Sequence, residues 1–190
     1  MVAVSPQGCV MGRALALLMA AWLLFAGPAW ADTPASAAQV QQRAKAVTQV
    51  VLGILSYARW PVEPVPLRLC LVGPTEYADD LIKGNVQNSG QPLQVRRLLA
   101  NDPRVATACD ALYIGKLDPG ERDRLFQSVS GHPVLSISEA DDPCAVGSLF
   151  CLRVSDEQVA FEVNLDSVAR SGVRIHPSVL QLSRRRAVQP

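Results

Sequence analysis

Four of the five cysteines of the sequence lie beyond its first third, at positions 70, 109, 144 and 151. In an oxidising compartment an even number of cysteines indicates a disulfide framework, and four cysteines allow three pairings. The short separation of Cys144 and Cys151, across a segment that contains Gly147, favours a local bridge and leaves Cys70 to pair with Cys109. Zinc is the alternative, but the sequence has no Cys-x-x-Cys pair and only two histidines, so we expect no metal site.

A second group of side chains, Arg59, Arg174 and His176, has the chemistry of an anion site. Guanidinium groups match phosphate or carboxylate oxygens through paired hydrogen bonds, and a histidine adds a donor whose charge depends on pH. The three side chains would hold a small anion if the fold brings them together. The residues alone leave another interpretation open, in which both arginines are surface side chains and His176 caps the helix that follows it.

The motifs of several common enzyme classes are missing. The sequence has no Gly-x-Ser-x-Gly nucleophile motif, no Walker phosphate loop, no Gly-x-Gly-x-x-Gly and no His-Glu-x-x-His. Adjacent carboxylates such as Asp79-Asp80 and Asp141-Asp142 are more typical of solvated faces and helix caps than of catalytic pairs. We therefore predict that the protein is not an enzyme and uses no cofactor. A hydrolase of an unrecognised type is the weaker alternative.

The first 31 residues have the layout of a secretory signal peptide. Arg13 precedes an apolar run over residues 14–26, which is followed by a Gly27-Pro28 break and the small-residue triplet Ala29-Trp30-Ala31. The run is shorter than the about 20 apolar residues that a membrane-spanning helix needs. We predict cleavage after Ala31, export to the periplasm and one mature domain over residues 32–190. An uncleaved membrane anchor is the alternative.

The charges of the chain nearly cancel, with 18 Lys and Arg residues against 17 Asp and Glu residues. This balance does not favour a nucleic-acid partner or a membrane surface. A basic cluster at residues 184–186 comes at the end of a predicted helix, where positive charge complements the helix dipole. We interpret this cluster as a solvated helix end.

Helical and strand-like segments alternate along the part of the chain that must position these side chains. Apolar spacing predicts helices over residues 37–57, 119–129, 164–171 and 177–186, and a proline start predicts another over residues 74–81. Strands are predicted over residues 67–72, 92–98, 109–115 and 133–138, followed by a hairpin of residues 149–154 and 158–164. This order predicts a single α/β domain of three layers, with a mixed β-sheet flanked by helices and an antiparallel C-terminal hairpin. In the last helix, Val179, Leu180 and Leu182 are predicted to face the core.

Six short segments occur in an order that is more informative than any one of them. The first two are Tyr57-Ala58-Arg59-Trp60-Pro61 and, at residues 67–73, Leu-Arg-Leu-Cys-Leu-Val-Gly. The others are residues 109–115, the strand Pro-Val-Leu-Ser-Ile-Ser at 133–138, Phe161-Glu162-Val163-Asn164-Leu165 and Leu180-Gln181-Leu182-Ser183. With a signal peptide in front and four cysteines in place, residues 32–186 resemble the YfiR family of periplasmic regulators.

The resemblance implies a binding function. YfiR-like proteins are negative regulators that bind the periplasmic sensor domain of an inner-membrane diguanylate cyclase of the YfiN type and keep its catalytic domain inactive. Release of the cyclase raises cyclic di-GMP and promotes biofilm formation. An outer-membrane lipoprotein of the YfiB type is implied as the partner that sequesters the regulator.

The resemblance also carries expectations about assembly and sites. It implies an α/β homodimer with disulfides that match Cys70–Cys109 and Cys144–Cys151. It further implies that the positions of Arg59, Arg174 and His176 take part in binding a small anionic or aromatic ligand. A periplasmic protein that binds or senses a small molecule is therefore the alternative function.

Apolar residues of the predicted hairpin and the helix after it are candidates for the contact surface with the cyclase. They are Phe150, Leu152, Val163 and Val168. The alternative, which ordinary patterns of burial favour, is that they belong to the core.

Overall fold

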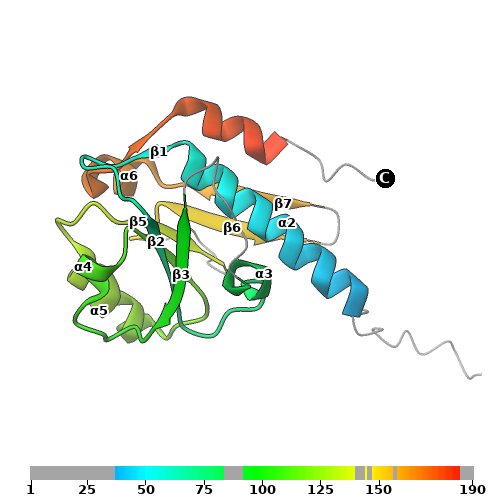
Figure 1. Cartoon of the computed structure of the whole chain (residues 1–190), viewed down its shortest axis with the longest axis horizontal. Coiled ribbons are helices and arrows are strands. Elements are labelled where there is room, and N and C mark those ends of the chain that lie inside the picture. The colour runs from blue at the N-terminus through cyan, green and yellow to red at the C-terminus, as the bar shows by residue number, and fades with distance from the viewer. Residues whose placement is uncertain (1–36, 84–91, 140–143, 145–146, 156–157, 185–190) are drawn as a thin grey trace, which may run out of the picture. The chain divides into compact units, whose positions relative to one another are not determined.

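The computed structural model describes residues 37–83, 92–139, 144, 147–155 and 158–184 (Figure 1). The predicted signal peptide, the Asp141-Asp142 pair and the last two residues of the basic cluster lie outside the described residues. No helix in the described part of the chain has the length and apolar character needed to span a membrane.

Helix α2 (Ala37–Ser56) opens the described chain and ends within one residue of its predicted boundary. Its buried residues recur every three or four positions, as on the apolar stripe of an amphipathic helix. They include Val47, Val51, Ile54 and Leu55. The buried Ala58 and the Trp60-Pro61 step follow the helix, because the residue before a proline is disfavoured in helical geometry.

Six strands form the main sheet in the order β3-β2-β4-β5-β6-β7. They are β2 (Leu67–Val72), β3 (Leu93–Leu98), β4 (Ala111–Ile114), β5 (Leu135–Ser138), β6 (Phe150–Val154) and β7 (Val159–Val163). Neighbours run parallel from β3 to β6, and the β6–β7 hairpin is antiparallel. The near-continuous apolar runs of β2 and β4 suit central parallel strands that are buried on both faces. The predicted mixed sheet with an antiparallel C-terminal hairpin is confirmed.

Two hydrophobic clusters on opposite faces of the sheet define three layers. Leu67, Leu69 and Leu71 of β2 belong to a cluster that includes α2 and the 3₁₀ helix η2 (Pro177–Arg184). The alternate residues Cys70 and Val72 belong to a second cluster with α4 (Val105–Ala108) and α5 (Pro119–Val129). Helices α2 and η2 therefore cover one face, and α4 and α5 cover the other (Figure 1). The predicted three-layer α/β arrangement is confirmed.

The final helix and the hairpin correct two sequence predictions about exposure. Because η2 is a 3₁₀ helix with three residues per turn, Val179 and Leu182 share its inner face. Leu180 points away and is 53% exposed, so the prediction that it faces the core is wrong. Conversely, Phe150 and Leu152 are buried in the core and are not a contact surface. The other two candidates, Val163 and Val168, are partly buried against the same core.

The connection after β2 differs from the helix predicted over residues 74–81. Only α3 (Asp79–Ile82) is helical, and residues 74–78 form a loop. Backbone groups of this loop form hydrogen bonds with residues outside it. The carbonyl of Pro74 accepts a hydrogen bond from the Lys116 amide at 2.8 Å. A Cβ at Gly115 would fall 1.9 Å from the Pro74 oxygen, so this close approach requires a glycine. Contacts to the end of β4 thus replace the first helical turn.

A buried carboxylate, Glu139, holds the same loop from the end of β5. Glu139 is 5% exposed, and its Oε1 accepts hydrogen bonds from the backbone amides of Glu76 and Tyr77. Burial raises the pKa of Glu139 above its ordinary value, although the two backbone hydrogen bonds oppose the rise. The nearby Tyr113 hydroxyl is also buried, and burial together with the Glu139 charge raises the pKa of Tyr113.

The Glu139→Gln variant is expected to lose part of the pH dependence of stability. A carboxyl whose pKa is higher in the folded state than in the unfolded state binds more protons in the folded state. The wild type therefore loses stability as the pH rises from 4.5, the ordinary pKa of a glutamate, through the raised pKa of Glu139. Glutamine keeps an acceptor oxygen but does not titrate. Urea unfolding from about pH 4 to 8 should show a flatter profile for Glu139→Gln. The exposed substitution Glu63→Gln is the control, and an unchanged profile for Glu139→Gln would contradict the assignment.

Candidate anion-binding site

A two-stranded ribbon outside the main sheet positions Arg59 and Arg174. Strand β1 (Ala58–Arg59) directly follows α2, and β8 (Arg174–Ile175) follows α6 (Leu165–Ser171). The two strands pair antiparallel with Arg59 opposite Arg174. Residues directly opposite in such a pair project from one face, with Cβ atoms about 4.5–5.5 Å apart. The β1–β8 ribbon therefore holds two like charges side by side, an arrangement that a bound anion would relieve.

Local signals in the sequence account for the turn that precedes β8. Asn164 caps α6, because its Oδ1 accepts a hydrogen bond from the Ser167 amide at 3.0 Å. Gly172 ends the helix with φ of 73°, a left-handed conformation that favours glycine. Val173 is then buried and anchors the start of β8. The end of the predicted helix at residue 171 is confirmed.

Arg59 and Arg174 line one cavity of about 360 Å³. The other residues in its wall are Trp60, Pro61 and Gly172. The indole of Trp60 is buried, and its Nε1 donates a hydrogen bond of 3.0 Å to the Asp110 carbonyl, which fixes the aromatic wall. Two cations beside an aromatic wall suit a small anion, particularly one with a planar body.

The guanidinium groups of Arg59 and Arg174 differ in the hydrogen bonds that they form. One terminal nitrogen of Arg59 donates hydrogen bonds to the Ser56 and Ala58 carbonyls at 2.8 Å and 2.7 Å, where α2 ends and β1 begins. The other nitrogens of that guanidinium have no hydrogen bond within the part of the chain that the structure describes, so they can donate to a ligand. The side chain of Arg174 is exposed and has no hydrogen bond or ion pair to any residue that the structure describes. Arg174 is therefore the side chain best placed to reorient toward an anion.

His176 lies next to the ribbon but does not line this cavity. Its amide donates to the Tyr57 carbonyl at 2.9 Å, and its ring stacks on Tyr57 with centroids 6.2 Å apart. The Nδ1 atom accepts a hydrogen bond of 3.2 Å from the Ser178 amide in the first turn of η2. The structure thus places His176 as a cap of the helix that follows.

Sequence reasoning missed three residues of the cavity wall. These residues are Trp60, Pro61 and Gly172, of which the first two were noted as part of a segment that resembles the YfiR family. The available clue was a large aromatic residue adjacent to Arg59, because an indole beside a guanidinium is a common way to build a binding wall. The pairing of β1 with β8 joins residues that lie more than 100 positions apart in the sequence, and no local pattern predicts it.

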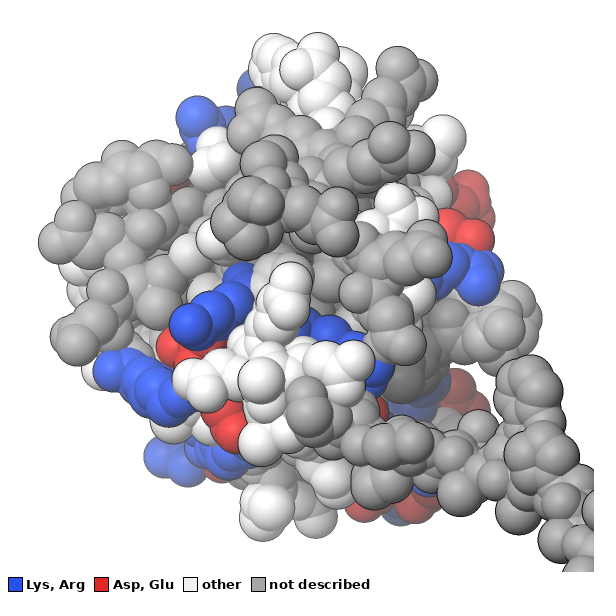
Figure 2. Space-filling view, turned by 90° about the vertical axis from the view of Figure 1, so that its right-hand side faces the viewer, with Lys and Arg blue, Asp and Glu red and all other residues white. Residues whose placement is uncertain are grey.

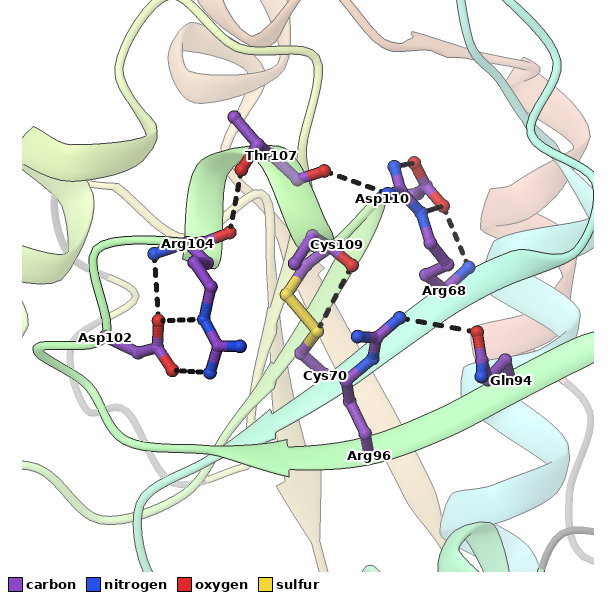
Figure 3. The surroundings of a disulfide bond; sticks show 10 residues. Arg68, Cys70, Gln94, Arg96, Asp102, Arg104, Thr107, Cys109 and Asp110 are labelled. Atoms are coloured by element: carbon purple, nitrogen blue, oxygen red, sulfur yellow. Dashed lines mark hydrogen bonds and ion pairs between the residues drawn. A yellow bond between two sulfur atoms is a disulfide. The ribbon is translucent and has the colours of Figure 1, made fainter.

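The structure pairs Cys70 with Cys109 and Cys144 with Cys151, the pairing that the spacing favours. The first bridge is buried and joins β2 to the C-cap of α4, directly before the neighbouring strand β4 (Figure 3). The predicted strand over residues 109–115 therefore begins two residues late, at Ala111. The second bridge ties Cys144 to β6 at the start of the hairpin.

An ion pair next to the first bridge supports the wall of the cavity. Asp110 accepts hydrogen bonds from the amide, Nε and a terminal nitrogen of Arg68 at 2.8, 2.8 and 2.6 Å. Arg68 also donates to the Thr107 carbonyl at 2.8 Å (Figure 3). The hydrogen bond to Asp110 raises the pKa of the Arg68 guanidinium. The disulfide and this ion pair fix the position of Asp110. The Asp110 carbonyl in turn accepts the hydrogen bond from Trp60 and so fixes the indole.

Charged side chains on one face of the molecule are mixed in sign. In Figure 2 the described Lys and Arg residues are interspersed with Asp and Glu residues and with uncharged ones. Mixed charge produces a weaker long-range field than a basic patch does. The visible part of this face therefore offers separate basic side chains rather than a continuous basic surface.

Comparison with known proteins assigns the chain to a family. A family model described as YfiR/HmsC-like matches residues 44–184, which is more than half of the chain. The matched range includes the four disulfide cysteines, the β1–β8 ribbon and the cavity between Arg59 and Arg174. The chain belongs to the YfiR/HmsC-like family. The family resemblance seen in the sequence is thereby confirmed.

Membership of the YfiR/HmsC-like family indicates the general class of function. It supports a role as a periplasmic regulator of cyclic di-GMP signalling, in a family that is regulatory rather than catalytic. The two disulfides agree with an oxidising compartment such as the periplasm.

Proposed function

We propose that this YfiR/HmsC-like protein is a periplasmic repressor of an inner-membrane diguanylate cyclase of the YfiN type. It binds the sensor domain of the cyclase, keeps the cytoplasmic catalytic domain inactive and thereby limits cyclic di-GMP and biofilm formation. The observation that carries the proposal is the family match over residues 44–184. The two disulfides and the signal-peptide pattern support export to the compartment where the sensor domain lies.

A regulator of this kind must bind its target and also release it. A ligand shifts a two-state equilibrium only by its differential affinity for the two states. A lipoprotein of the YfiB type that sequesters the repressor would provide that bias, and so would a small ligand. The rigid part of the molecule is the stapled sheet, in which the buried Cys70–Cys109 bridge links β2 to the segment before β4. We further propose that the working form is a homodimer.

The repression proposal is tested by deleting the gene and measuring cellular cyclic di-GMP. We expect a rise of severalfold that a plasmid copy of the wild type reverses. A double deletion that also removes the cyclase is the control, and it should show no rise. Cyclic di-GMP that stays unchanged in the single deletion, while the cyclase is present, would refute the repression.

Direct binding is tested separately with the purified mature protein and the isolated sensor domain. We expect a complex under oxidising conditions, by size-exclusion chromatography with light scattering, which also reports whether the repressor is a dimer. Recovery of the two proteins in separate peaks at concentrations well above the micromolar range would argue against a direct contact.

A second function, the binding of a small anionic or aromatic ligand, is favoured by the cavity between Arg59 and Arg174. Two guanidinium groups in register on the β1–β8 ribbon and a buried indole wall support this function. It is compatible with repression, because a ligand at the ribbon would be one way to bias the release of the cyclase.

A further inference from the structure

Strand β3 is an edge of the main sheet, because β2 is its only partner among the described strands. The Leu67 amide donates a hydrogen bond of 2.9 Å to the Pro92 carbonyl. In a regular parallel ladder the backbone groups of alternate residues then face β2, and those of the residues between them face outward. The outward residues of β3 are Leu93, Val95 and Arg97. Their amides and carbonyls form no hydrogen bond within the part of the chain that the structure describes.

Little along β3 prevents another strand from pairing with this edge. Proteins protect exposed edges with prolines, bulges, charged side chains or very short strands. Strand β3 spans 6 residues without a proline, and its register with β2 is unbroken over that length. Arg97 is exposed, but its guanidinium donates hydrogen bonds to the Thr75 hydroxyl at 2.8 Å and the Gly73 carbonyl at 3.3 Å. That side chain therefore lies over the loop after β2 and does not cover the edge.

The β3 strand is complementary to itself in one antiparallel register. A twofold axis at Val95 places this residue opposite the partner's Val95. It also places Leu93 opposite the partner's Arg97, and Gln94 opposite the partner's Arg96. In an antiparallel pair, opposite residues exchange both of their backbone hydrogen bonds at alternate positions. Here those positions are the outward ones of β3, so the second copy uses every outward backbone group.

The side chains of β3 fit the same register. Gln94 Oε1 accepts a hydrogen bond of 3.3 Å from a terminal nitrogen of Arg96 on the same strand, and Figure 3 shows the two side chains next to each other. Arg96 has no acidic partner among the described residues, so an opposite glutamine supplies a second neutral acceptor. Leu93 and Val95 are only partly buried against the core, and pairing of two β-branched Val95 side chains covers more of this apolar surface.

The charges of β3 select this register over the neighbouring ones. An axis at Arg97 would place that arginine directly opposite its own copy, and like charges in that position destabilise a sheet. An axis at Leu93 would place Arg97 beyond the end of the partner's β3 and leave its outward backbone groups unused. An axis between two residues would set outward groups of one copy against residues whose groups face β2.

We propose that two copies of this protein associate through their β3 strands, antiparallel about a twofold axis at Val95, so that their main sheets form one continuous sheet. This inference rests on the homodimer proposed above and assigns its interface. A twofold contact of one edge with itself closes after two copies, so it produces a dimer and not a filament. The proposed repression of the cyclase does not depend on which surface forms the dimer.

The interface is tested by amide hydrogen exchange of the oxidised wild-type protein, followed by NMR at about 20 μM and about 1 mM, because a small interface forms a weak dimer. We expect the outward amides of Leu93, Val95 and Arg97 to exchange at least about tenfold more slowly at the higher concentration. The amides of Gln94 and Arg96, which face β2 in either state, should not change. Sedimentation should show a monomer converting to a dimer over the same range.

Variants at Gln94 test the register. Gln94→Arg places an arginine opposite the partner's Arg96 at two symmetry-related positions, so the dissociation constant of the dimer should rise about tenfold. The exchanged variant Gln94→Arg/Arg96→Gln restores one arginine opposite one glutamine, as well as the net charge, and should recover most of the affinity. Gln94 is exposed, so neither change disturbs the core. Gln127→Arg, at an exposed position on α5, adds the same charge elsewhere and should dimerise like the wild type.

Several outcomes would overturn the β3 interface. They are a protein that stays monomeric at about 1 mM, outward β3 amides that exchange rapidly in the dimer, protection confined to the other edge strand β7, and equal dimer affinity of Gln94→Arg and the wild type. A dimer that is unaffected by Gln94→Arg would use another surface. The cyclic di-GMP level of the deletion strain tests repression by itself, so failure of the interface and failure of the repression remain distinguishable.

Discussion

Replacing Cys70 and Cys109 together by alanine is expected to lower the free energy of unfolding by about 4 kcal/mol. The bridge closes a loop with a sequence separation of 39 residues, so its loss returns a large conformational entropy to the unfolded chain. Both cysteines are buried, and alanine avoids placing an unpaired hydroxyl in the core. Urea unfolding of the oxidised wild type and of the variant measures the difference.

The Cys144→Ala/Cys151→Ala variant is the matched control for this expectation. Its bridge spans a sequence separation of only 7 residues, for which the chain-entropy estimate is about 2.4 kcal/mol. The long bridge should therefore stabilise the protein more than the short one. The opposite ranking would show that loop entropy is not the main contribution of these disulfides.

The two bridges should also differ in their effects on function. The Cys144–Cys151 bridge lies at the start of the hairpin, so its loss should loosen the hairpin and weaken repression without unfolding the sheet. Loss of Cys70–Cys109 should act mainly through global stability and through the hold on Asp110. Cyclic di-GMP in strains that carry each variant, measured together with protein abundance, separates these effects.

Binding of a nucleoside monophosphate is expected to weaken about 10- to 100-fold when either Arg59 or Arg174 is replaced by alanine. A hydrogen bond to a charged group contributes about 1.5–3 kcal/mol, and each 1.4 kcal/mol is a tenfold change in affinity. The double variant Arg59→Glu/Arg174→Glu should not bind at all, because it repels the anion. Isothermal titration calorimetry with the monophosphate and with inorganic phosphate measures these changes.

The control for the arginine variants is Arg104→Ala. Arg104 forms an ion pair of 2.7 Å with Asp102, its side chain is 71% exposed, and it lies outside the wall of the cavity. Its removal changes the net charge by the same amount as removal of Arg174. Equal loss of affinity in Arg104→Ala and Arg174→Ala would show that binding depends on net charge and not on the ribbon.

Elements with strong local patterns were predicted well, and those that depend on distant contacts were not. The apolar stripe of α2 and the alternation in the β6–β7 hairpin depend on neighbours in the sequence. By contrast, residues 74–78 form a loop because Glu139, more than 60 positions away, binds two of their amides. Nothing in the sequence of residues 74–81 indicates that the Glu139 carboxylate binds their backbone amides.

In the candidate site, too, local patterns predicted some features and distant contacts decided the others. Arg59 and Arg174 were predicted as anion ligands from their chemistry, and their position side by side depends on the register of the β1–β8 ribbon. His176 was grouped with them, with helix capping as the alternative, and its Nδ1 atom accepts a hydrogen bond from the Ser178 amide in η2. The residues that complete the wall, Trp60 and Pro61 among them, were not predicted as part of a site.

By itself, the amino-acid sequence determined the family, the α/β order of elements, the end of α6 and the preferred pairing of four cysteines. These features depend on periodicity, spacing and backbone preferences, which act over a few residues. Only the tertiary structure decided which arginines face each other and which apolar residues of the hairpin are buried. Those features depend on side-chain contacts between segments that meet only when the sheet and its two helical layers have packed.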